Sequence, residues 1–100
     1  MTEAEYRERK VIDTDYMAAL AVLDTEYQSL RRPFDKNYND NYDLLEQMLV
    51  PGGSRTQFKV LTSAYNALIA PLASAYIAKI ESANRVYFAC IRAFDTRFSN

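Results

Sequence analysis

Tyrosine recurs every eleven residues in both halves of the sequence, and this spacing constrains the fold more than any other feature. The two series are Tyr16, Tyr27 and Tyr38, and then Tyr65, Tyr76 and Tyr87, which Phe98 continues. Eleven residues make almost three turns of α-helix at about 3.67 residues per turn, so residues spaced this way line one face with little drift. The spacing predicts two long helices, each with a continuous packed stripe.

Other apolar residues fill the same two stripes. Most of them stand four or seven residues after a tyrosine, as Leu20, Leu23 and Ile69 do. Arg31 is an exception, and Leu30 beside it takes the apolar role in this interpretation. The residues predicted to form the packing interface are Tyr16, Tyr27, Phe34, Tyr38, Tyr65, Leu72, Tyr76, Tyr87 and Phe94.

The segment PGGS, residues 51–54, contains both glycines of the chain and is its one strong turn signal. The rest of the chain lacks the spaced glycine and proline residues typical of an all-β protein. We therefore expect an all-α fold in a single domain over residues 1–100. In this fold a first helical arm (about 3–50) and a second (about 55–98) form a long antiparallel hairpin with eleven-residue (hendecad) repeats.

Two prolines leave a second architecture open. Pro33 and Pro71 each stand six residues after a tyrosine, and a proline inside a helix costs about 3 kcal/mol. Because the tyrosine spacing continues across both, we interpret them as kinks within long helices. In the alternative, each proline begins a new helix, which would give a compact four-helix bundle.

The two halves of the chain carry opposite charge. Residues 1–50 hold six Lys/Arg against eleven Asp/Glu, whereas residues 51–100 hold six against two. Arms of opposite charge attract each other, within one molecule or between molecules. Two helices touch along one seam, and the second arm is apolar on more than one face, so further chains are needed to cover it.

These observations predict an oligomeric bundle of the coiled-coil kind. The expected function is that of a non-enzymatic, self-assembling structural or scaffold protein, either a closed oligomer or a filament subunit. Its expected partner is another copy of itself or a larger protein complex.

The segment DKNYNDNYDLLE, residues 35–46, supports a different function. Its polar residues fall at the first, third, fifth, ninth and twelfth places of an EF-hand calcium loop; they are Asp35, Asn37, Asn39, Asp43 and Glu46. The sixth place needs glycine for its backbone conformation, and Asp40 stands there. We therefore favour a helix in which these acids are solvated, and keep a calcium-binding helical module with a degenerate loop as the alternative.

Most other functions find no support in the sequence. The chain has no histidine and no glycine-rich phosphate loop, so no catalytic site, cofactor or further metal site is predicted. The acidic first arm opposes nucleic-acid binding by the basic second arm. Residues 60–78 are uncharged, but polar side chains such as Asn66 disfavour a membrane span.

Two further expectations concern the cell compartment and the thiol. The charged start MTEAEYRERK does not resemble a signal peptide, which predicts a cytoplasmic protein. Cys90, the single cysteine, lies among Phe88, Ala89 and Ile91, and this setting predicts a buried, inert thiol.

Overall fold

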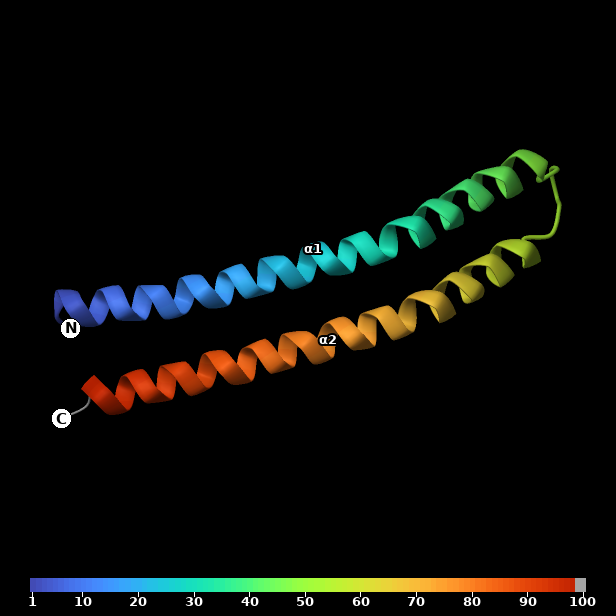
Figure 1. The fold of residues 1–100 in the computed structure, drawn as a ribbon. Helices are drawn as coiled ribbons and strands as arrows, with labels where there is room; N and C mark the ends of the chain where they lie inside the picture. The colour runs from blue at the N-terminus through green and yellow to red at the C-terminus, as the bar shows by residue number, and fades with distance from the viewer. Residues whose placement is uncertain (99–100) are drawn as a thin grey trace. The chain divides into compact units, whose positions relative to one another are not determined.

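The computed structural model describes residues 1–98, and these residues form two helices and no strand. Helix α1 spans Glu3–Met48 and helix α2 spans Thr56–Phe98. A short turn joins them (Figure 1). The predicted all-α helical hairpin is confirmed.

Local signals in the sequence set the helix ends. At the start of α1, the backbone N–H of Glu5 donates to Thr2 Oγ1 at 3.2 Å, which satisfies one of the donors that a helix N-terminus leaves unpaired. Glu3 and Glu5 place negative charge in the first turn, where the helix dipole favours it. Arg97 places positive charge in the last turn of α2, where the dipole favours a cation.

The connection between the helices contains a tight turn at Val50–Gly53. The N–H of Gly53 donates to the Val50 carbonyl at 2.8 Å, and Gly52 has a φ of 77°. Proline at the second position and a glycine with positive φ at the third are typical of a type II turn. A Cβ at Gly53 would lie 2.9 Å from the Val50 oxygen, so both glycines are required for this backbone path.

Both prolines lie inside helices. Pro33 is part of α1 and Pro71 is part of α2, so the alternative with four short helices is wrong. The contacts around Pro33 give a physical reason: Arg31 precedes it, Asp35 follows it, and both bond to the hydroxyl of Tyr65 on α2. These bonds hold the helix on either side of the proline and offset its missing N–H.

The chain divides into two compact units. Unit 1 combines Met1–Thr25 with the chain from Tyr76 onward, and unit 2 is Glu26–Ala75. In each unit, a segment of α1 and a segment of α2 run side by side in opposite directions (Figure 1).

Each unit buries one large side chain. In unit 1, Phe94 is 4% exposed and its ring centroid lies 4.9 Å from that of Phe98. In unit 2, Phe58 is 7% exposed, meets the Tyr42 ring edge-on at 5.0 Å, and lies 4.5 Å from the Arg55 guanidinium carbon. No other apolar side chain among the described residues is buried to this degree. A pair of helices shields little more than the seam between them.

Candidate functional site

The most specific contacts of unit 1 centre on Tyr87 of α2. Its hydroxyl donates to Asp13 Oδ1 at 2.7 Å and accepts from Arg9 Nη2 at 3.4 Å, while Arg9 Nε donates to Asp13 Oδ1 at 3.3 Å. The Tyr16 ring stacks on the Tyr87 ring, with 4.3 Å between centroids and 23° between planes. The Tyr16 hydroxyl also donates to Asn84 Oδ1. We call Arg9, Asp13, Tyr16 and Tyr87 the first tyrosine cluster.

Unit 2 contains the same arrangement around Tyr65. Its hydroxyl donates to Asp35 Oδ1 and accepts from Arg31 Nη2 at 3.0 Å, and the Arg31 and Asp35 side chains form an ion pair at 3.6 Å. The Tyr38 ring lies 4.6 Å from the Tyr65 ring, and its hydroxyl is 3.1 Å from Thr62 Oγ1. We call Arg31, Asp35, Tyr38 and Tyr65 the second tyrosine cluster.

The two clusters match residue for residue. Each α1 member of the second cluster stands 22 residues after its counterpart in the first, and Tyr65 stands 22 residues before Tyr87. In both, an arginine and an aspartate four residues later share one tyrosine hydroxyl from α2. The same polar contact between the helices is therefore built twice.

The electrostatics of the clusters follow from these bonds. The hydrogen bond from Tyr87 lowers the pKa of Asp13 below its ordinary value, and the bond from Arg9 adds to the effect, although partial desolvation opposes it. The hydrogen bond to Tyr65 raises the pKa of Arg31. The first cluster stabilises the ionised form of Asp13, and in both clusters the arginine and the aspartate hold a tyrosine hydroxyl in place.

Acid is expected to weaken the first cluster. Because the folded chain lowers the pKa of Asp13 below 3.8, the unfolded chain binds the proton more readily. The Asp13 contacts are fully present above about pH 4 and are lost as the pH falls through the folded-state pKa.

We therefore expect Asp13→Asn to be less stable than the wild type at pH 7, with the difference shrinking below about pH 4. Urea unfolding at a series of pH values measures this. Asp15→Asn, which removes an exposed acid two residues away, is the control and should show no such convergence. If the wild type remained more stable than Asp13→Asn by the same free energy of unfolding at low pH, the role of Asp13 would be contradicted.

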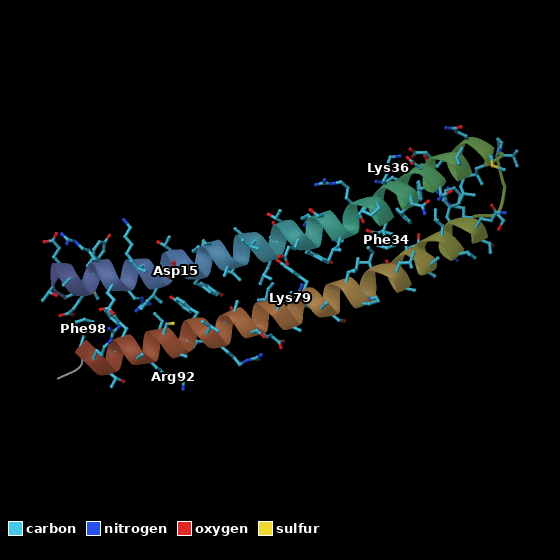
Figure 2. The ribbon with its side chains drawn as sticks, viewed as in Figure 1. Asp15, Phe34, Lys36, Lys79, Arg92 and Phe98 are labelled. Atoms are coloured by element: carbon cyan, nitrogen blue, oxygen red, sulfur yellow. The ribbon has the colours of Figure 1, made fainter. Side chains whose placement is uncertain are left out.

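None of the nine predicted packing residues is fully exposed. Phe94 is buried, and the other eight are half-buried. The clusters bring together Tyr16 with Tyr87 and Tyr38 with Tyr65. In unit 2, Phe34 points toward α2 whereas Lys36 points away from it (Figure 2).

The sequence interpretation missed the polar half of each cluster. It treated Arg31 as an exception in the stripe and Asp35 as a solvated acid, whereas both bond to Tyr65. A signal was present: the pattern Arg-x-x-x-Asp, with tyrosine three residues further on, occurs at Arg9 and again at Arg31.

The loop required by the calcium alternative is not formed. Residues 35–46 are helical throughout and belong to α1. A helix directs side chains outward over its circumference, so it does not wrap Asp35, Asp43 and Glu46 around one ion as an EF-hand loop does. Among residues 1–98, no group of three or more acidic or cysteine side chains is placed to hold a metal ion.

The prediction of a buried thiol is wrong. Cys90 is exposed and lines an open groove with Tyr16 and Val86 in unit 1. A third helix would cover its position beside the seam, and residues 1–98 form two.

Helix α2 is the more apolar of the two helices. This helix contains an 18-residue stretch that is long and apolar enough to cross a membrane by length and composition alone, and none of the stretch is buried within the chain. No family model, curated protein or solved structure matches the chain.

Proposed function

We propose that this chain is a non-enzymatic structural protein that assembles with copies of itself into a larger helical bundle, as an oligomer or filament subunit. Uncovered apolar surface carries the proposal. Val60, Ile77 and Val86 of α2 are 63%, 54% and 65% exposed, while Phe58 and Phe94 are the buried core. A helix that is apolar on more than one side is typically covered by other helices, and these residues lie on more than one side of α2.

The spacing of the half-buried positions supports packing of the coiled-coil kind. Along α1 these positions include a series with steps of three and four residues that repeats every eleven: Ile12, Tyr16, Leu20, Leu23, Tyr27, Arg31, Phe34, Tyr38, Tyr42 and Leu45. An eleven-residue period keeps a stripe on one face over many turns. We expect the helices to bend at Pro33 and Pro71, where a backbone hydrogen bond is lost.

A second copy covers the apolar surface of α2 better than a lipid bilayer does. Tyr65 lies within the uncharged run of residues 60–78, and its hydroxyl is bonded to Arg31 and Asp35 of α1. A membrane would have to accept this ion pair, or the pair would have to be broken, and charged groups are costly in hydrocarbon. A second copy also brings charge of the opposite sign to each helix.

Molar mass measured by light scattering across a range of concentrations tests the proposal. We expect an oligomer that dissociates on dilution, because exposed apolar surface drives association. A monomer of 11.5 kDa at every concentration would contradict it.

The same measurement with and without calcium distinguishes the calcium-binding alternative from the proposed function. A calcium-responsive module would change its mass or shape on adding the ion, and Glu46→Gln would abolish that change. Our proposal predicts identical masses in both conditions for wild type and variant.

A further inference from the structure

One side of unit 1 carries an open apolar groove between α1 and α2. It consists of two adjoining hollows of about 240 Å³ and about 570 Å³, and Ala19 and Ala83 line both. Tyr16 and Val86 contribute to the first hollow, and Val22 contributes to the second. The groove therefore runs over more than one helical turn of each segment.

The groove is bordered by exposed residues at helical spacing. On α1, Asp15, Ala19 and Val22 follow one another at steps of four and three. On α2, Ser82, Val86 and Cys90 follow at steps of four. Residues at these steps share one face of a helix. Val22 and Val86 are 56% and 65% exposed, so the single chain leaves the face uncovered.

Charge indicates what covers this face. In unit 1, the α1 side (residues 1–25) holds three Lys/Arg against six Asp/Glu, and the α2 side (residues 76–98) holds four against two. The segments that form the two borders therefore carry net charge of opposite sign, and the charged residues that line the groove are Asp15 on α1 and Lys79 on α2. A partner that matches both borders must itself carry an acidic and a basic helix side by side, as a second copy of this chain does.

We propose that two copies dock groove to groove through unit 1, about a two-fold axis parallel to the helices. This inference rests on the self-assembly proposed above and names its surface. Such an axis lays the acidic segment of each copy antiparallel on the basic segment of the other. A two-fold axis perpendicular to the helices, in the plane of the interface, would instead place the two acidic segments against each other and the two basic segments against each other. The small side chains Ala19, Ala78 and Ala83 let the facing helices approach closely.

Cys90 provides a probe at the groove without any engineered residue. As an exposed thiol, it should react readily with N-ethylmaleimide in dilute protein. In the docked dimer it is covered. We expect the reaction to become about tenfold slower when about nine tenths of the chains are paired, by mass action.

Two variants of α2 then distinguish docking through the groove from docking through another part of the α2 surface. Val86→Arg places a charge in the groove, whereas Ile77→Arg places the same charge at a similarly exposed apolar residue. These positions are nine residues apart, which puts them on opposite sides of the helix. We expect Val86→Arg to be monomeric with an unprotected Cys90, and Ile77→Arg to dimerise as the wild type does.

Circular dichroism checks that each variant retains its helices, and Ala19→Arg, on α1, repeats the groove test if Val86→Arg unfolds. Loss of dimer in Ile77→Arg with retention in Val86→Arg would refute the groove while leaving self-assembly intact. Monomers in all three proteins, wild type included, would refute self-assembly itself. Protection of Cys90 by phosphatidylcholine vesicles in monomeric protein would show that lipid covers the face and would overturn the proposal.

Discussion

Phe94→Ala is expected to lower the free energy of unfolding by about 3–4 kcal/mol, the largest effect of any single truncation in unit 1. Phe94 is 4% exposed, so its removal leaves a cavity that two helices have few other side chains to fill. Urea unfolding measures the change, at a fixed and low protein concentration, since association would add its own stabilisation.

Phe88→Ala is the matched control for this experiment. Phe88 lies on the same helix six residues earlier and is 57% exposed, so we expect its loss to cost about 1 kcal/mol or less. Equal costs at the two positions would show that the hairpin does not pack on Phe94 in solution.

The second large effect is expected at the tyrosine clusters. Tyr87→Ala and Tyr65→Ala each remove a half-buried ring and a hydroxyl that bridges an arginine and an aspartate. We expect each to cost about 2 kcal/mol, less than a fully buried aromatic residue. Because the two clusters are built alike, the two costs should agree within about 0.5 kcal/mol.

Conservative variants separate the contribution of the ring from that of the hydroxyl. Tyr87→Phe and Tyr65→Phe keep the ring stack and lose the hydroxyl, so each should cost about 1 kcal/mol. Tyr6→Ala is the control, because Tyr6 is 58% exposed and lies outside the eleven-residue series. A loss at Tyr6 as large as at Tyr65 would mean that the spacing has no energetic meaning.

The helical hairpin could be predicted from the sequence because one period governs most of both arms. A tyrosine every eleven residues requires a helix for its members to meet, and PGGS is the single place where both glycines break that helix. Whether the helix continues through Pro33 was harder to predict, since proline occurs both at the start of helices and at kinks within them. The contacts of Arg31 and Asp35 on either side of it favour continuity.

The polar half of the clusters was harder to predict because charged residues are usually solvated. The sequence pattern places Asp35 in an exposed strip and does not set it apart from Asp40, which pairs with Lys36 on the same helix, whereas the structure gives Asp35 a hydrogen bond from Tyr65 on the other helix. The exposure of Cys90 was missed for a different reason: apolar neighbours indicate burial only when enough chain is present to cover them.

The duplicated clusters also determine how the two helices align along their length. A ladder of identical tyrosines would tolerate sliding by one eleven-residue step, because each ring would meet another ring. In one direction such a slide gives Asp13 the hydroxyl of Tyr76 but places Ser54, in the connection between the helices, opposite Asp35. In the other direction it places Phe98, which has no hydroxyl, opposite Asp13. Two acids that each require a tyrosine hydroxyl thus select one register from a repeat that would otherwise permit several.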